Sequence, residues 1–365
     1  TRFRQDVVMK MGTPLLLSDL GIDVLDTAMV ETAAFIVGKE RLDDRFLCFK
    51  QLADFEKDRS LRECITQVQC GVLTERVFYI APSVFLSLPG SPFAYWAPGS
   101  LLTLGFKHHA FEPHVGMVRV GVQTDNDSRF VRLWWEVPRS TLVQSEHKDY
   151  WAPFLKGDGS SPFLFEHLMV LKWTNAGSEL KEATAAAPGG RINNECDFFK
   201  PGISWAVRTS RFSPHVVPRG CIPSVSRYLA LPTSLDGLAL IALWNSKVVD
   251  EYCKLRMERH GHPKFIVGVV KDVPTPRVDS RTESRLRDLA YVAWQALRDL
   301  NSISETSRMF CIPAAALNPS KTVSENCHEW LRLVQSKNAV IAESRSAIDA
   351  LAGQVYGVDV ANLST

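Results

Sequence analysis

The sequence predicts a mixed α/β protein of the α+β class with three parts. A run of apolar residues without alternation, at positions 33–37, is typical of a strand inside an α/β sheet. Short β-like runs separated by turn residues fill the middle of the chain, and apolar residues at helical spacing fill the last third. We therefore expect an α/β part over residues 1–85, a strand-rich part over 86–278 and a helix pair or helical bundle over 279–365.

Length and composition indicate a folded protein with more than one core. The chain has 365 residues, more than twice the usual domain length of about 150 residues. Its 45% hydrophobic and 22% charged residues exclude a largely disordered or purely coiled-coil chain. The net charge of +2 gives no global attraction to a polyanion, so any nucleic-acid signal must be local. No apolar run approaches the ~20 residues that span a bilayer and the start shows no signal-peptide pattern, so we expect a cytoplasmic protein.

The first part contains two predicted strands, at residues 15–20 and 29–37, which we expect to be neighbours. Because the second run is continuously apolar, we expect it to be covered on both faces. Two strands cannot form such a sheet, so further strands come from later in the chain or are encoded upstream. Residues 61–69 are predicted to be helical, and the Pro- and Gly-rich residues 87–96 form a connector near the first boundary.

The middle of the chain is predicted to consist of strands and turns. Predicted strands cover residues 117–122, 130–137, 163–173, 203–207 and 265–270. The polar residues 175–194 are expected to be an exposed excursion.

The last part is predicted to be helical. Ser280 is a good N-cap for a helix with apolar residues at helical spacing up to residue 300. Val334, Ile341, Ile348 and Val355 lie on a seven-residue period, which indicates one long helix after Cys327. We expect this stripe to pack on the helix that begins near Ser280.

The common catalytic motifs do not occur in the sequence. It has no Gly-x-Gly-x-x-Gly, no Gly-x-x-x-x-Gly-Lys-Ser/Thr, no His-Glu-x-x-His and no Gly-x-Ser-x-Gly. Eight cysteines are scattered without a Cys-x-x-Cys pair, so we expect reduced thiols and no metal site. Taken as an isolated enzyme, the chain offers no catalytic residues.

Two polar stretches suit nucleic-acid binding. Residues 198–227 combine Arg and Lys, small hydroxyls and glycines with aromatics, which are the groups that contact phosphates and base edges. On composition alone, a β-rich segment with Arg on its solvated faces is the better explanation. The loop at 121–130 suits base readout or a simple hairpin turn, and composition alone favours the turn.

An ordered series of motifs then resembles a known family. The series is Gly90-Ser91-Pro92-Phe93-Ala94-Tyr95-Trp96, residues 121–130 followed by 132–137, Phe199-Lys200-Pro201-Gly202-Ile203-Ser204-Trp205, Pro218-Arg219-Gly220-Cys221-Ile222, Leu243-Trp244-Asn245-Ser246-Lys247-Val248, and 265–276. It resembles the C-terminal half of the adenine-specific DNA methyltransferases of BREX phage-defence systems and of the related type IIG restriction-modification enzymes. The resemblance covers about residues 15–280 and weakens in the final helices.

The resemblance implies a DNA-binding target-recognition domain preceded by the end of a methyltransferase sheet. In that family an N-terminal domain binds S-adenosylmethionine, and an Asn-Pro-Pro-Tyr or Phe motif holds the flipped adenine. Neither that motif nor the glycine-rich cofactor loop occurs in this sequence. We therefore expect a fragment, split subunit or truncated gene product that recognises double-stranded DNA, holds no cofactor and is inactive alone, with S-adenosylmethionine bound only in the full-length parent.

Candidate contact residues follow from their chemistry. Base-edge readers are predicted at Gln123, Asn126 and Arg129, because Gln and Asn can pair with adenine and Arg with guanine. Phosphate contacts are predicted, on one basic face, for Lys200, Ser204, Arg208, Arg211, Arg219 and Ser246, and close backbone approach for Gly121, Gly202 and Gly220. The four tryptophans Trp134, Trp135, Trp205 and Trp244 are expected in the core rather than as stacking platforms.

A different class of function stays open. The chain is alternatively a protein-interaction or scaffold subunit that docks onto a separately encoded methyltransferase, nuclease or other defence-system subunit. In that case the heptad stripe from Val334 to Val355 is the partner surface. The absence of catalytic motifs fits this alternative equally well.

Overall fold

The computed structural model confirms a mixed α+β protein. It describes residues 3–25, 28, 30–39, 45–52, 54–72, 74–142, 150–157, 159–257, 263–318 and 320–363. The chain forms two compact units: unit 1 comprises residues 1–107 and 254–261, and unit 2 comprises residues 108–253 and 262–365. The three-part division expected from the sequence stays a prediction.

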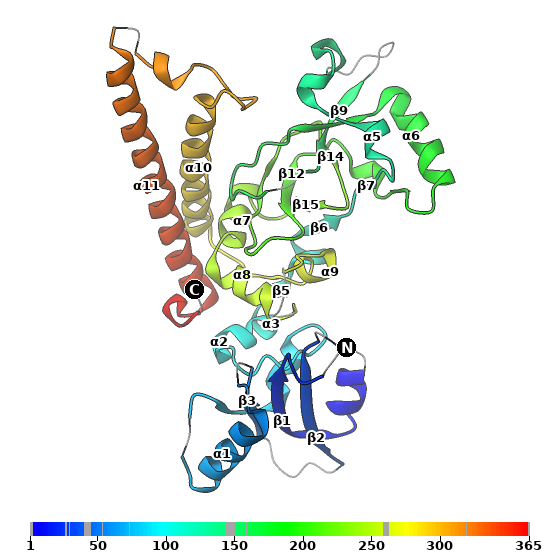
Figure 1. The fold of residues 1–365 in the computed structure, drawn as a ribbon, viewed down its shortest axis with the longest axis vertical. Coiled ribbons are helices and arrows are strands. Elements are labelled where there is room, and N and C mark those ends of the chain that lie inside the picture. Colours follow the sequence, from blue (N-terminus) through cyan, green and yellow to red (C-terminus); the bar gives the residue numbers. More distant parts are fainter. Residues whose placement is uncertain are drawn as a thin grey trace. The chain divides into compact units, whose positions relative to one another are not determined.

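Unit 1 is built on a four-stranded sheet (Figure 1). Its elements are η1 (Phe3–Val8), β1 (Thr13–Gly21), β2 (Thr32–Gly38), β3 (Phe46–Lys50), α1 (Lys57–Gln69), β4 (Val77–Ile80), η2 (Pro82–Ser87), α2 (Gly99–Leu102) and α3 (Leu104–Lys107). The strand order is β2-β1-β3-β4, with β1 antiparallel to β2 and parallel to β3. The predicted pairing of the first two strands is thus confirmed, although Met29, the start of the second predicted run, lies outside the described residues.

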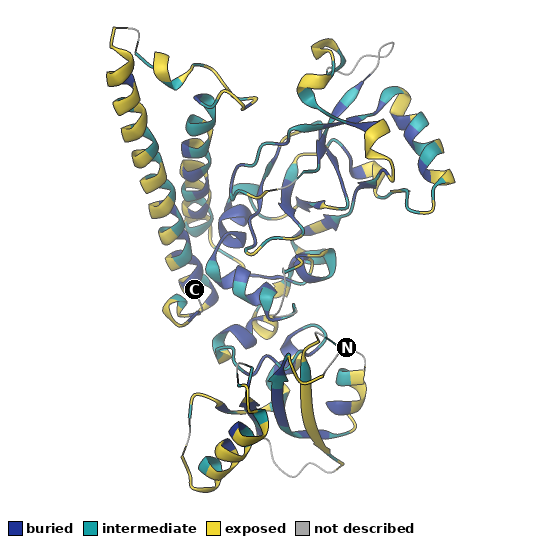
Figure 2. Ribbon diagram, viewed as in Figure 1, coloured by how far each residue is buried: buried dark blue, intermediate teal, exposed yellow. Residues whose placement is uncertain are grey.

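The expectation that the second strand is covered on both faces is wrong. β2 is an edge strand, and its residues 33–37 are all exposed (Figure 2). Phe35 and Ile36 are 53% and 55% exposed, although β2 carries no charge and no proline. Later strands β3 and β4 complete the sheet on its other side, so an apolar run alone did not specify a central position.

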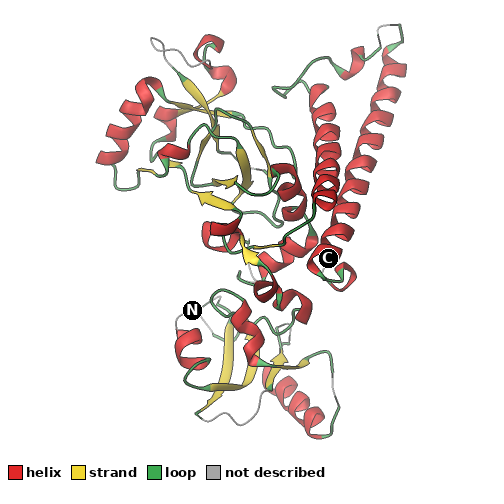
Figure 3. Cartoon of the chain, turned by 180° about the vertical axis from the view of Figure 1, so that it is seen from behind, coloured by secondary structure: helices red, strands yellow, loops and turns green. Residues whose placement is uncertain are grey.

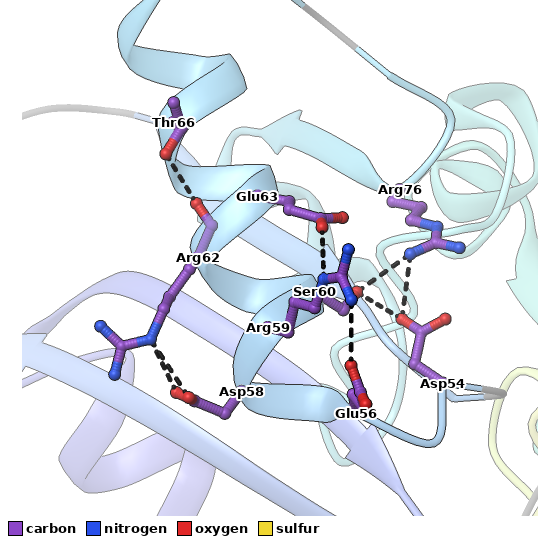
Figure 4. Close-up of polar contacts among 9 residues, drawn as sticks. All are labelled: Asp54, Glu56, Asp58, Arg59, Ser60, Arg62, Glu63, Thr66 and Arg76. Carbon is purple, nitrogen blue, oxygen red and sulfur yellow. Dashed lines mark hydrogen bonds and ion pairs between the residues drawn. The ribbon is translucent and has the colours of Figure 1, made fainter.

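Helix α1 covers one face of this sheet. Its residue Cys64 packs with Phe49 and Val77 of β3 and β4. Its outer surface carries ion pairs between residues of the same helix (Figure 4). Nε of Arg62 lies 3.1 Å from Oδ2 of Asp58, and Nε of Arg59 lies 3.1 Å from Oε1 of Glu63. Such exposed pairs contribute only a few tenths of a kcal/mol each, ~0.3 to 0.5. The cations of α1 shown there are therefore each matched by a carboxylate.

Unit 2 contains two larger sheets and a helical layer (Figures 1 and 3). Its strands are β5 (His109–Ala110), β6 (Gly116–Arg119), β7 (Val122–Gln123), β8 (Val131–Leu133), β9 (Trp151–Leu155), β10 (Met169–Lys172), β11 (Arg191–Ile192), β12 (Gly202–Ala206), β13 (His215–Val217), β14 (Ile222–Pro223), β15 (Arg227–Pro232) and β16 (Pro274–Thr275). One sheet has the order β13-β12-β15-β6 and the other β14-β9-β10-β8, while β11 pairs with β7 and β16 with β5.

Among the helices of unit 2, α7 (Gly237–Trp244) contributes the most to the core, because its residues 239–244 are all buried. The helices of this unit are α4 (Phe111–His114), α5 (Asp127–Phe130), α6 (Thr174–Ala186), α7 (Gly237–Trp244), α8 (Lys247–Lys254), α9 (Val267–Val270), α10 (Ser280–Ser302) and α11 (Val323–Tyr356), with short helical turns η3 (Trp134–Glu136), η4 (Arg139–Leu142), η5 (Glu195–Asp197), η6 (Ala314–Ala316) and η7 (Val360–Asn362). Asp236 caps α7 by accepting from the N–H groups of Leu238 and Ala239. The Trp244 ring of α7 lies 5.8 Å from that of Trp205, both fully buried, as expected for core tryptophans.

The long C-terminal helix pair is confirmed. α10 and α11 run antiparallel beside each other (Figures 1 and 3). In the seven-residue stripe Ile348 is buried, whereas Val334, Ile341 and Val355 are half-buried. α11 begins at Thr322, whose hydroxyl accepts from the Glu325 N–H, and α10 is capped by Asp279 rather than by the predicted Ser280.

Several predicted elements differ in the structure. The predicted strand at 130–137 is strand only over β8 and continues as η3, and the predicted strand at 163–173 is strand only over β10 apart from an isolated bridge at Phe163. Residues 267–270 form the short helix α9 instead of a strand, and its Val269 and Val270 are buried. The polar stretch expected to be an exposed excursion contains α6, whose Leu180 is buried in the core. The other buried residues of this helix are Gly177 and Thr184. None of the eight cysteines, all of which lie in the described ranges, forms a disulfide.

Candidate nucleic-acid interface

The loop at residues 121–130 projects from a rigid frame in unit 2. Val122 and Phe130, at its two ends, are each 1% exposed and belong to one apolar cluster. Between them residues 125–129 are all exposed. The loop therefore presents five consecutive side chains to solvent while both of its ends are fixed in the core.

A second turn lies against this loop. Strand β7 pairs with β11, which places Gln123 opposite Arg191. A Cβ atom on Gly189 would lie 2.4 Å from Oδ1 of Asp125, so the glycine turn before β11 packs directly on the loop. Arg191 is exposed and forms no ion pair among the residues that the structure describes. Sequence reasoning missed Arg191; a basic residue directly after Pro188-Gly189-Gly190 was the available signal.

Two of the three predicted base readers already have partners within the protein. The side-chain oxygen of Asn126 caps α5, accepting from the Arg129 N–H at 3.1 Å, so only its amide N–H groups are left to donate. The Arg129 guanidinium lies 2.9 Å from Glu179, which also pairs with Lys172. Hydrogen bonds from Lys172 and Arg129 hold the pKa of Glu179 below its usual value.

The predicted phosphate contacts fall into two groups. β12 and β13 form an antiparallel hairpin in which Gly202 pairs with Val217. Lys200 and Arg219 therefore lie at one end of the hairpin, and Arg208 and Arg211 lie at the other. The structure does not bring this set together as one contiguous cluster, because strand β12 (Gly202–Ala206) separates Lys200 from Arg208. That the four cations act as one basic face stays a prediction.

The cations in these groups differ in how they are neutralised. Lys200 pairs with Asp197 at 2.6 Å, and the same carboxylate accepts from Arg119 at 2.6 Å. Burial opposes ionisation of Asp197, but the hydrogen bonds from Lys200 and Arg119 outweigh it and keep its pKa low. Arg211 donates to the Asn245 carbonyl at 3.0 Å. Within the described part of the chain, Arg208 and Arg219 are exposed and form no ion pair.

The predicted serine and glycine contacts serve the fold. Ser204 and Ser246 are fully buried, and the Ser246 hydroxyl donates to the Leu243 carbonyl at 2.6 Å. A Cβ atom on Gly121 would lie 1.8 Å from the Pro223 carbonyl oxygen, and one on Gly202 would lie 2.5 Å from that of Ala230. The close approach at these two glycines is thus to the protein's own backbone.

Gly220, unlike Gly121 and Gly202, has no backbone packed against its Cβ position, and Trp135 is not buried. Gly220 has φ +93° with open space around it, so the turn itself requires glycine. Trp135 is 53% exposed, unlike the core tryptophans.

Among the described residues, no three His, Cys, Asp or Glu side chains gather as a metal site would require. No helix in the described ranges has the length and apolarity to cross a bilayer.

Comparison with known proteins confirms the family resemblance. No protein-family model matches the chain. It is 25% identical over 351 residues to the adenine-specific methyltransferase PglX of Lacticaseibacillus casei, covering 90% of this chain and 28% of that protein. It is 24% identical over 230 residues to the adenine-specific methyltransferase BrxX of Escherichia coli, covering 61% of this chain and 18% of that protein. The chain is thus related to the BREX-type adenine-specific methyltransferases and spans less than a third of the length of these relatives.

Proposed function

We propose that unit 2 recognises double-stranded DNA for an adenine-specific methyltransferase of a phage-defence system. The observation that carries the proposal is the surface formed by the 121–130 loop and the turn before β11. It places the amide of Gln123 and the guanidinium groups of Arg129 and Arg191 on one rigid frame. Amide and guanidinium groups are the side chains that discriminate adenine and guanine in the major groove. The relationship to two adenine-specific methyltransferases supports DNA as the ligand.

In this proposal the Arg129 guanidinium leaves Glu179 and binds the edge of a guanine base. Glu179 holds the guanidinium in place in the free protein, and a guanine edge offers two acceptors in the same plane. The exposed Arg208 and Arg219 contact phosphates at the two ends of the β12–β13 hairpin. We assign no methyl-transfer step to this chain, because its sequence has neither the cofactor loop nor the motif that holds the adenine amino group.

Selection from a random duplex pool, followed by fluorescence anisotropy on the selected site and a scrambled one, tests the proposal. Arg129→Ala should weaken binding to the selected site by ~1 to 3 kcal/mol and leave the scrambled duplex unaffected. Arg219→Ala should weaken both duplexes alike and reduce the salt slope by about 0.9. Arg62→Ala in α1, an exposed arginine paired with Asp58, is the matched control (Figure 4). Failure of the full chain to bind any duplex at low salt would exclude the proposal.

The scaffold function is favoured by one separate observation. Edge strand β2 exposes Phe35 and Ile36 without the charges or proline that usually protect such edges. Under this alternative a partner chain pairs with β2. Phe35→Lys would then abolish assembly with that partner while leaving duplex binding at the wild-type level, whereas the DNA proposal alone predicts no change in either measurement.

A further inference from the structure

A cavity in unit 2 lies outside the proposed base-reading surface. Its volume is about 340 Å³, and it opens between the turn after β13, the segment before β10, and helix α10 with the segment that follows it. Pockets of about 300 to 1,000 Å³ are the usual size for small-molecule ligands, so this one suits a compact ligand.

The walls combine aromatic rings with cations. Phe165 and Trp294 line the cavity together with Arg219 and Arg308. Both arginines are exposed, and among the described residues neither forms an ion pair. Rings offer stacking surfaces and guanidinium groups offer paired donors to phosphate oxygens.

Arg308, in the connection between α10 and α11, is held in position by other residues. Its backbone N–H donates to Oε1 of Glu166, and its guanidinium donates to the His167 carbonyl at 3.4 Å. The guanidinium also lies 5.5 Å from the Trp134 ring centroid. Glu166, which lines the same cavity, keeps its second carboxylate oxygen as an acceptor for an amino group.

The inner wall contains a buried imidazole pair. Nε2 of His167 lies 3.2 Å from Nε2 of His215, and among the described residues Nδ1 of His167 has no hydrogen-bond partner. Burial, together with the charges of Arg227 and Arg308, lowers the pKa of His167 to about 3. The imidazole is therefore neutral at pH 7 and adds polarity to this wall without charge.

We propose that this cavity binds one nucleotide, with its base beside Phe165 and Trp294 and its phosphate on Arg219 and Arg308. Inorganic phosphate alone would make no use of the aromatic walls, and an uncharged ring would leave both guanidinium groups without an anion. The carboxylate of Glu166 disfavours a purely anionic ligand and suits a base with an exocyclic amino group. The nucleotide comes either from DNA, in which case this inference rests on the proposed function, or from free solution, in which case it does not.

Calorimetry with the full chain tests the cavity directly. The probes are dAMP, dGMP, dCMP and TMP, with inorganic phosphate and deoxyadenosine as partial ligands. We expect saturable binding of at least one nucleotide and at least about tenfold weaker binding of either partial ligand. Arg219→Ala and Trp294→Leu should each weaken nucleotide binding about tenfold, and Arg219→Lys should restore part of it. Arg62→Ala, which removes an exposed arginine of α1 that is paired with Asp58, should bind as the wild type does.

The source of the nucleotide is decided by duplex binding in the same variants. If the cavity binds a nucleotide that is part of the DNA, excess mononucleotide should compete with the duplex. Trp294→Leu should then also weaken duplex binding. If it is free, Trp294→Leu leaves duplex binding unchanged. Loss of duplex binding by the wild type with an intact nucleotide isotherm removes the proposed function but not the cavity. The inference is overturned if none of the four nucleotides gives a saturable isotherm at millimolar concentration. It is also overturned if folded Arg219→Ala and Trp294→Leu bind nucleotide as tightly as the wild type does.

Discussion

Substitution of Gly121 by alanine should destabilise unit 2 strongly. The added Cβ would lie 1.8 Å from the Pro223 carbonyl oxygen and 2.1 Å from its carbonyl carbon. These are backbone atoms, so the clash cannot be relieved by a side-chain rotation. Overpacking costs about 1 to 3 kcal/mol, and we expect the upper end because β14, which contains Pro223, is paired with β9. A loss of about 3 kcal/mol corresponds to a fall in Tm of roughly 6 to 12 °C in a domain of this size.

Thermal unfolding followed by circular dichroism measures this change. Gly268→Ala is the matched control, because it also lies in unit 2 but has open space around its Cβ position and lies in α9. Alanine there should leave the Tm unchanged or raise it slightly, by less than about 1 kcal/mol in stability. A Tm for Gly121→Ala within about 2 °C of the wild type would show that β14 moves freely away from this loop. The rigid frame assigned to the 121–130 loop would then be incorrect.

Three further outcomes are expected. Ile348→Asp places an unpaired carboxylate at a position that is 1% exposed and should lower the Tm by at least about 6 °C, whereas Leu331→Asp, 50% exposed on the same helix, should be nearly neutral; equal melting curves would contradict the packing of the stripe. Because the folded-state pKa of His167 lies near 3 and that of His215 well below 6.5, the unfolded chain binds protons first, so the free energy of unfolding should decrease as the pH falls from 6.5 toward 3, by up to about 1.4 kcal/mol per pH unit for each imidazole. Urea titrations at several pH values measure this slope, and an unchanged slope in His167→Gln would exclude the assignment. Calorimetry of the chain with S-adenosylmethionine should give no saturable isotherm, and a micromolar one would contradict our view that this chain holds no cofactor site.

Periodic signals in the sequence located the helices well. The seven-residue spacing from Val334 to Val355 predicted α11, because helical periodicity is set by neighbours three and four residues away. The capping box at Thr322 and Glu325 is a further sequence signal for the start of that helix. By contrast, burial of a strand depends on what lies beside it. The apolar residues of β2 looked like a central strand and are exposed at an edge.

The candidate site was only partly predictable for a similar reason. The loop at 121–130 was identified by its residue types, and the structure shows it exposed between two buried anchors. Its neighbour Arg191 was missed because β11 pairs with β7 across nearly seventy residues of chain, a separation that no local pattern reports. Glu179, whose carboxylate holds Arg129, lies on α6, within the polar stretch that the sequence predicts to be an exposed excursion.

The arrangement of the arginines shows why basic residues that are dense in a sequence need not form one surface. In a helix, residues three and four apart share a face, but along a strand each residue adds about 3.3 Å, so a cluster of eight residues becomes a line. Lys200 and Arg208 therefore lie two residues beyond the opposite ends of β12. A duplex lying along this hairpin would meet cations at two points roughly seven base pairs apart, at about 3.4 Å per base pair, rather than a continuous basic patch. Two separated phosphate contacts fix the position of a duplex better than one diffuse patch of the same charge, because sliding or tilting breaks at least one of them. If the proposed DNA recognition is correct, a chain with a net charge of only +2 would in this way hold DNA in register without attracting it strongly from a distance.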